Sequence, residues 1–137
     1  MTRVLIDVNV VLDVLAEREP FVADSQAVLQ FVEAGAIEGV LAAHSVTTLH
    51  YLLSKHLSKA RARKTLEDLL HILRVEAVDE DRVRHALAMN WSDFEDAVQA
   101  ACAEKAEADF VVTRDKRGFK RSVVRAITPA ELVAIIT

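Results

Sequence analysis

The first run of apolar residues predicts a buried strand at the start of the chain. Residues 3–9 read Arg-Val-Leu-Ile-Asp-Val-Asn, a run of β-formers that is too short for a helix and typical of strands buried on both faces of parallel sheets. Asp7 stands where this strand should end, and ligands in open α/β sheets bind outside the carboxyl ends of the strands. Asp7 is therefore either a functional carboxylate or the N-cap of the following helix.

The rest of the chain alternates between helical periodicity and short apolar runs. Ser45, Ser58 and the pair of Ser92 with Glu95 are the expected N-terminal caps, and Thr128 with Glu131 begins the last helix. Strands that alternate with helices imply a three-layer α/β/α sandwich with a mostly parallel five-stranded sheet, in a single domain of residues 1–137. The pattern predicts helices over residues 10–15, 21–35, 45–57, 58–70, 79–90, 93–107 and 128–137, and further strands over residues 39–43, 72–78, 109–113 and 123–127.

Composition excludes several classes of protein. Hydrophobic residues make up 52% of the chain, with only three glycines and two prolines, which argues against disorder and against a loop-rich β protein. No apolar run approaches the roughly 20 residues that span a membrane, and no signal segment opens the chain. The single cysteine excludes an internal disulfide. We therefore expect a cytoplasmic protein with no membrane partner.

The basic residues are concentrated in two segments. The net charge is −4, yet of 17 Lys and Arg residues five lie in residues 55–64 and six in residues 114–125. An acidic protein with local basic segments can present a phosphate-binding surface. An ordinary solvated helix face explains residues 55–64 equally well, whereas residues 114–125 surround a candidate site carboxylate.

Three acids fall where this layout brings them together. Asp7 follows the first strand, Asp96 lies in the first turn of the alanine-rich helix, and Asp115 follows the fourth strand. Clustered carboxylates repel one another, so a site that keeps them ionised needs a cation. Oxygen ligands favour Mg²⁺ or Mn²⁺, and such cations typically act on phosphates.

Four other polar residues lie close in sequence to these acids, and each can be explained by a structural role instead of a functional one. Asn9 could cap the first helix or orient Asp7, and Thr113 could end a strand or hold Asp115 through its hydroxyl. Glu95 is explained as a capping-box partner and Asp93 as an acid that interacts with the helix dipole. These alternatives stay open at the level of the sequence.

Five parts of the chain carry a resemblance to a known family: residues 4–9, 93–97 and 113–115, then Phe119 and residues 128–131. Together they resemble the PIN domain family over essentially the whole chain. The resemblance implies a metal-dependent ribonuclease fold, many small prokaryotic members of which are VapC-type toxins of toxin–antitoxin pairs. It also implies a homodimer and a small antitoxin partner.

The resemblance assigns a metal site to the acidic residues. Asp7, Asp96 and Asp115 would bind Mg²⁺ or Mn²⁺, with Asp93 as a further candidate, while Asn9 and Thr113 support them. The expected reaction is hydrolysis of single-stranded RNA, in which the cation lowers the pKa of the attacking water.

Three basic residues are the candidates for binding the RNA backbone. Arg114 and Lys116 flank Asp115, and Lys55 belongs to the other basic segment. Contacts of this kind hold phosphates and carry no sequence information by themselves.

The third predicted helix departs from the family pattern. Many PIN nucleases carry a Glu there, and the expected equivalent in this chain is His50. An imidazole cannot replace a carboxylate as a Mg²⁺ ligand. Asp93 or Glu95 would then have to supply the missing charge.

Two other functions stay open. Residues 7–10 also resemble the aspartyl-nucleophile motif of haloacid-dehalogenase-like phosphatases, although those enzymes carry a second Asp where this chain has Asn9. The non-enzymatic alternative is a catalytically weak PIN-fold module that binds RNA or protein. His50 supports this alternative, because it stands where many PIN nucleases carry a metal-binding Glu.

Overall fold

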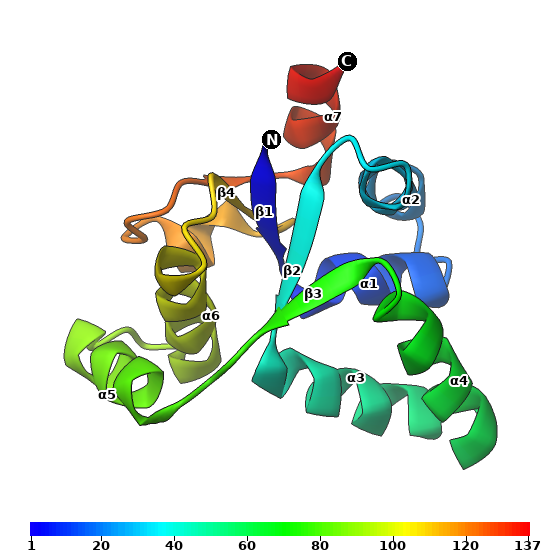
Figure 1. The fold of residues 1–137 in the computed structure, drawn as a ribbon, viewed down its shortest axis with the longest axis horizontal. Helices are drawn as coiled ribbons and strands as arrows, with labels where there is room; N and C mark the ends of the chain where they lie inside the picture. The colour runs from blue at the N-terminus through cyan, green and yellow to red at the C-terminus, as the bar shows by residue number, and fades with distance from the viewer.

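The computed structural model describes all residues from Met1 to Thr137. Five strands form one sheet in the order β3-β2-β1-β4-β5, and every neighbouring pair is parallel, which confirms the predicted α/β sandwich. Helices cover both faces of the sheet (Figure 1). The elements are β1 (Arg3–Ile6), α1 (Val8–Leu15), α2 (Val22–Glu33), β2 (Glu38–Ala42), α3 (Ala43–Ser54), α4 (Lys59–Leu69), β3 (Leu73–Glu76), α5 (Glu80–Met89), α6 (Phe94–Lys105), β4 (Phe110–Val112), the 3-10 helix η1 (Lys116–Phe119), β5 (Ala126–Ile127) and α7 (Pro129–Ile136).

The first strand is buried because apolar clusters lie on both faces of the sheet. Val4 and Ile6 join a cluster with side chains of α1, α2, α3, α4 and α7. Leu5 joins the opposite cluster, which contains side chains of α5 and α6. Successive side chains of a strand point to opposite faces. An uninterrupted apolar run is therefore what this central strand requires.

Local capping signals were right at some helices and wrong at others. The Ser58 side chain accepts a hydrogen bond at the start of α4, and Thr128 forms a capping box with Glu131 at the start of α7. The prediction that Ser45 caps the third helix is wrong, since Ser45 is buried inside α3, which begins after Ala42. An apolar residue at a cap position leaves no signal in the sequence.

The cap of α6 lies one residue later than predicted. The side chain of Asp93, rather than that of Ser92, accepts the hydrogen bond from the Asp96 amide, at 3.0 Å. Glu95 is therefore not a capping-box partner, and its carboxylate has no such structural duty. The last strand is also shorter than predicted, because Val123 is 81% exposed.

The helices are short, and the longest have 12 residues. No helix combines the length and the apolar composition that a membrane span requires. Cys102 lies fully buried in α6, and burial raises the pKa of its thiol to about 11. The cysteine is therefore part of the core.

The strand order places a crevice at the carboxyl ends of β1 and β4. The chain runs from β1 outward through β2 to β3, and then returns to the other side of β1 with β4 and β5. Such a reversal is the point at which open α/β sheets bind ligands. The Asp7 amide donates to the Val112 carbonyl at 3.0 Å, and the Thr113 amide donates to the Ile127 carbonyl at 2.9 Å. The sheet thereby fixes the backbone of both predicted site residues.

Candidate functional site

Asp7 stands at the end of β1 with both carboxylate oxygens held by hydrogen bonds. Its Oδ1 accepts from Nε2 of Gln99 at 3.2 Å, and its Oδ2 accepts from Oγ1 of Thr113 at 2.9 Å. Although Asp7 occupies the N-cap position of α1, its side chain makes no capping hydrogen bond, so the capping alternative is wrong. The Thr113 hydroxyl also accepts from the Asp115 amide at 3.2 Å. One polar chain thus joins the ends of β1 and β4 to α6.

Gln99 is a site residue that the sequence analysis missed. It is 1% exposed, and its Oε1 has no hydrogen-bond partner. It lies three residues after Asp96 and therefore on the same face of α6. That spacing was the available signal. A buried carbonyl oxygen without a partner, next to the Asp7 carboxylate, is suited to a cation or to a water that a cation carries.

Asp96 is the carboxyl group most strongly affected by its surroundings. Its pKa is raised from 3.8 to about 7, first by burial and then by the negative charges of Asp93, Asp7, Glu95 and Asp115, in that order. Like charges disfavour ionisation, and a bound cation reverses that effect. The charges of four other acids therefore act on Asp96 in this fold, whereas the assignment of these acids to a metal site stays a prediction.

The glycine of η1 allows this helix to lie directly against Asp96. A Cβ atom at Gly118 would be 2.7 Å from Oδ2 of Asp96, a distance that Cβ contacts essentially never reach. The side chain of Asp96 is thus enclosed by its own helix on one side and by the backbone of η1 on the other. This close approach helps to explain its burial.

Two further predicted site residues, Asp115 and Asn9, make no hydrogen bond to the carboxylates of Asp7 and Asp96. The Asp115 side chain is 64% exposed, and its Oδ1 accepts from the backbone amide of Arg117 at 3.2 Å and from Nε of Arg117 at 3.3 Å. Asp115 therefore caps η1 at the mouth of the site. Asn9 lies inside α1, so the prediction that it caps this helix is wrong, and its side chain forms no hydrogen bond with Asp7.

The oxygen atoms at this edge of the sheet are of the kind that bind a hard cation, but they do not surround a single position. Carboxylate and amide oxygens are the ligands that Mg²⁺ and Mn²⁺ prefer. In this arrangement no group of three His, Cys, Asp or Glu side chains is close enough together to hold a metal ion. The ligand candidates share one edge of the sheet, and binding would require side-chain movement of Asp96 or Asp115.

The third helix presents a different histidine to the acids from the one predicted. His50 is exposed on α3, whereas both ring nitrogens of His44 are buried without hydrogen-bond partners. Burial lowers the pKa of His44, and the charge of Glu95 opposes this shift. His44 follows the end of β2 much as Asp7 follows the end of β1. His44 is therefore the α3 histidine on which the charge of Glu95 acts, whereas the assignment of His50 to the family's Glu position stays a prediction.

The structure does not bring Lys55 to the site. Lys55 follows the last turn of α3, with its ammonium group 4.5 Å from the centre of the Tyr51 ring. Because α3 begins at the carboxyl edge of the sheet and rises about 1.5 Å per residue, its far end is roughly 18 Å away. Figure 1 shows α3 running from the end of β2 toward α4, on the opposite side of the view from α6.

Arg114 and Lys116 are close to the site, and both have partners within the chain. The Arg114 guanidinium lies 3.5 Å from Oδ1 of Asp13 and 4.3 Å from the centre of the Phe21 ring. The Lys116 ammonium lies 3.1 Å from the Glu131 carboxylate. Their role in phosphate binding stays a prediction.

Asp13 is the second residue near the site that the sequence analysis missed. It is fully buried, its carboxylate accepts no hydrogen bond, and Nη1 of Arg18 lies 3.8 Å from its Oδ1. Burial raises the pKa of Asp13, while Arg114 and Arg18 lower it. The signal was a single acid inside the apolar run of residues 10–15. Asp13 fixes Arg114 beside the ends of β1 and β4.

Comparison with known proteins agrees with this fold. The profile of the PIN domain matches residues 3–117. Ribonuclease VapC1 of Aquifex aeolicus (strain VF5) is 25% identical over 119 residues, which cover 83% of this chain and 82% of that protein. A toxin–antitoxin complex from Klebsiella pneumoniae holds a chain with a TM-score of 0.69 at 18% identity, covering 92% of this chain and 97% of that one. For VapBC-1 from nontypeable Haemophilus influenzae the TM-score is 0.70 at 12% identity, with coverages of 94% and 99%.

Proposed function

The chain belongs to the PIN domain family, and from this premise we propose that it is a divalent-cation-dependent endoribonuclease acting on single-stranded RNA. The observation that carries the proposal is the position of Asp96. Its pKa is raised to about 7 by burial and by four neighbouring carboxylates at the switch point of the sheet. The ribonuclease name of the Aquifex aeolicus relative supports the same reaction class.

In this proposal the carboxylates bind the cation, and neighbouring side chains orient the carboxylates through hydrogen bonds. Asp7, Asp96 and Asp115 would bind Mg²⁺ or Mn²⁺, with Asp93 as a further ligand. When bound, the cation supplies Lewis acidity to phosphodiester hydrolysis. Gln99 and Thr113 orient Asp7 through hydrogen bonds of 3.2 and 2.9 Å.

The positive charges near the site have a supporting role. Arg114 and Lys116 raise the local potential for phosphate, although each already has an acidic partner. Arg114 is further restrained by the face of the Phe21 ring. We assign these two residues to attraction of the RNA backbone rather than to the reacting phosphate.

The test of this function is metal-dependent cleavage of single-stranded RNA with analysis of the product ends. Hydrolysis should leave 5′-phosphate and 3′-hydroxyl ends, and EDTA should abolish it, because attack by water needs the cation. Products carrying a cyclic 2′,3′-phosphate in EDTA would contradict the proposal. They would point instead to 2′-hydroxyl attack assisted by a histidine.

Gly118→Ala should slow RNA cleavage by about ten-fold or more, equivalent to about 1.4 kcal/mol in activation free energy. The added methyl group would meet Oδ2 of Asp96 at 2.7 Å, so either the carboxylate or η1 must move. The measurement is the cleavage rate in Mn²⁺, with the unfolding temperature recorded in parallel.

Gly35→Ala is the matched control for that substitution. Gly35 has a φ of +78°, and a methyl group added there would have no atom within 4 Å, so the change strains the backbone without touching the site. It should lower stability by about 1 kcal/mol and leave cleavage unchanged. Equal cleavage by wild type and Gly118→Ala would show that Asp96 is not placed by this contact.

We also propose a small antitoxin as partner and a homodimer. One solved chain with the same fold comes from a toxin–antitoxin complex of Klebsiella pneumoniae. A mostly apolar pocket of about 180 Å³ between α1 and α3 is lined by side chains that include Leu12, Leu15 and Leu52. Tyr51 on α3 is 58% exposed, whereas Leu49 and Leu53 are core residues. A strictly monomeric mass in solution at micromolar concentration would contradict the dimer.

The second candidate function is a PIN-fold module that binds RNA without cleaving it. The observation that favours it is that no three potential ligands meet at one point. Binding without cleavage in Mn²⁺ would establish it. The aspartyl-phosphatase alternative has less support, because both Asp7 oxygens accept hydrogen bonds and Asn9 stands where a second acid would be needed.

A further inference from the structure

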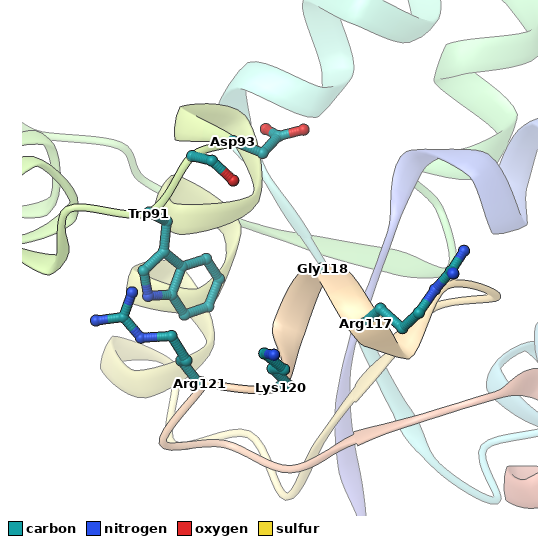
Figure 2. A pocket seen from close by; sticks show the side chains of 7 residues that line it. Trp91, Asp93, Arg117, Gly118, Lys120 and Arg121 are labelled. Atoms are coloured by element: carbon teal, nitrogen blue, oxygen red, sulfur yellow. The ribbon is translucent and has the colours of Figure 1, made fainter.

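A pocket of about 260 Å³ lies between the start of α6 and η1. Figure 2 shows the Trp91 indole beside the Arg121 side chain, with Lys120 nearby and Arg117 extending away from the indole. The pocket is lined by two short segments of the chain, which are far apart in sequence. The lining residues are Trp91, Ser92, Asp93, Arg117, Gly118, Lys120 and Arg121.

The basic side chains of this pocket include charges that no acid neutralises. Lys120 and Arg121 are exposed and take part in no ion pair, unlike Lys116, which pairs with Glu131, and Arg114, which pairs with Asp13. Half of the six bases in residues 114–125 line the pocket, and the two free cations contribute most to its attraction for phosphate.

Trp91 adds a fixed aromatic surface to these charges. Its indole packs edge-on against Phe119, with ring centroids 6.0 Å apart and planes at 83°. Phe119 is itself buried, and Asn90 just before the tryptophan has a φ of 56° that ends α5. A base stacks on any aromatic face whatever its identity. Restrained in this way, the ring can take part in stacking with little loss of conformational entropy.

The pocket borders the candidate metal ligands. Gly118, which lines it, is the residue whose Cβ would meet the Asp96 carboxylate at 2.7 Å. Asp93, which also lines it, accepts the hydrogen bond from the Asp96 amide. A nucleotide in the pocket would therefore lie next to a phosphate placed at the carboxylates.

We propose that this pocket binds one nucleotide of single-stranded RNA beside the cleaved phosphodiester, with the base on Trp91 and phosphates on Lys120 and Arg121. The inference rests on the proposed ribonuclease function. A single strand is required because bases within a duplex are already stacked and cannot reach the ring. An acidic protein segment would use the charges but would leave the aromatic face unstacked.

The test uses Trp91, the only tryptophan in the chain, as its own reporter. The wild-type protein in EDTA is titrated with an oligouridylate of about ten nucleotides, and indole fluorescence is followed. Stacking should quench the fluorescence saturably. Changing both Lys120→Gln and Arg121→Gln should weaken binding about ten-fold and lower the slope of log affinity against log salt by about 1.4, which corresponds to two phosphate contacts.

The matched control removes the same two charge types from the other basic segment. Lys59→Gln with Arg61→Gln on α4, where neither residue has an ion-pair partner, should change affinity less than about two-fold. Equal losses in both double variants would overturn the pocket. Inorganic polyphosphate that binds as tightly as the RNA would also overturn it, because charge alone would then explain binding.

These outcomes are separable from failure of the proposed function. RNA cleavage in Mn²⁺ without a fluorescence response would remove the nucleotide pocket and leave the ribonuclease. Quenching by RNA that is specific to Lys120 and Arg121, in a protein that cleaves nothing in Mn²⁺, would keep the pocket and remove the ribonuclease.

Discussion

Asp7→Asn is expected to lower the rate of metal-dependent RNA cleavage at least about 100-fold, while the protein stays folded. Loss of a residue that only supports a metal ligand typically lowers affinity or activity by about 10–100-fold, so loss of the ligand itself should exceed that range. Asp7 is 6% exposed and held on both oxygens, which makes it the most fixed of the candidate ligands.

The fold should survive this change because Gln99 can adapt. Oε1 of Gln99 has no partner, so rotation of the Gln99 amide can present an acceptor to the new Asn side-chain amide. Asp81→Asn, at an exposed position in the first turn of α5, is the control for loss of one carboxylate. Undiminished cleavage by Asp7→Asn, in protein freed of contaminating nuclease, would remove Asp7 from the metal site.

Asp96→Asn is expected to abolish cleavage and, above pH 7, to stabilise the metal-free protein. The pKa of Asp96 is about 7 in the folded protein, against an ordinary value of 3.8. Between pH 3.8 and about pH 7 the folded state therefore binds more protons than the unfolded state. The contribution of Asp96 to wild-type stability should therefore be greatest near pH 4 and should fall as pH rises to about 7. The full pKa shift corresponds to about 4 kcal/mol of unfolding free energy. Because Asp96 is partly exposed to water, the variant should gain about 1–3 kcal/mol in unfolding free energy over wild type.

Urea unfolding of wild type and Asp96→Asn across pH 4 to 8 measures this effect. The two proteins should have equal unfolding free energies near pH 4, and the variant should become the more stable one as pH rises, since the asparagine carries no charge at any pH. Addition of Mn²⁺ at pH 8 should then stabilise wild type more than the variant, because binding to the folded state alone raises stability. Parallel pH profiles for the two proteins would contradict the electrostatic description of the site.

The framework of the fold was predictable from sequence because its signals are local. The apolar run of residues 4–6 and the later run at residues 110–112 both require a strand buried on two faces, and they form the neighbouring strands β1 and β4. Asp7 and Thr113 could then be placed, since the ends of parallel neighbours share one edge. Asp96 followed from its place in the first turn of α6.

The remaining site residues depend on packing that no local pattern reveals. Gln99 and Asp13 are polar residues within helices, and only the assembled core shows that they are buried and face Asp7 and Arg114. His44 was overlooked because a helical period alone does not show which histidine of α3 is buried near Glu95. Lys55 was predicted at the site because sequence gives no direction for α3.

The most direct measurement is the rate at which a single-stranded RNA labelled at its 5′ end is cut, followed over a titration of Mn²⁺ with wild type and Asp7→Asn purified side by side. A cation held by the carboxylates predicts that the wild-type rate rises saturably with Mn²⁺ and falls to background in EDTA, while Asp7→Asn stays at background throughout. Equal rates for the two proteins, or cleavage that persists in EDTA, would contradict it.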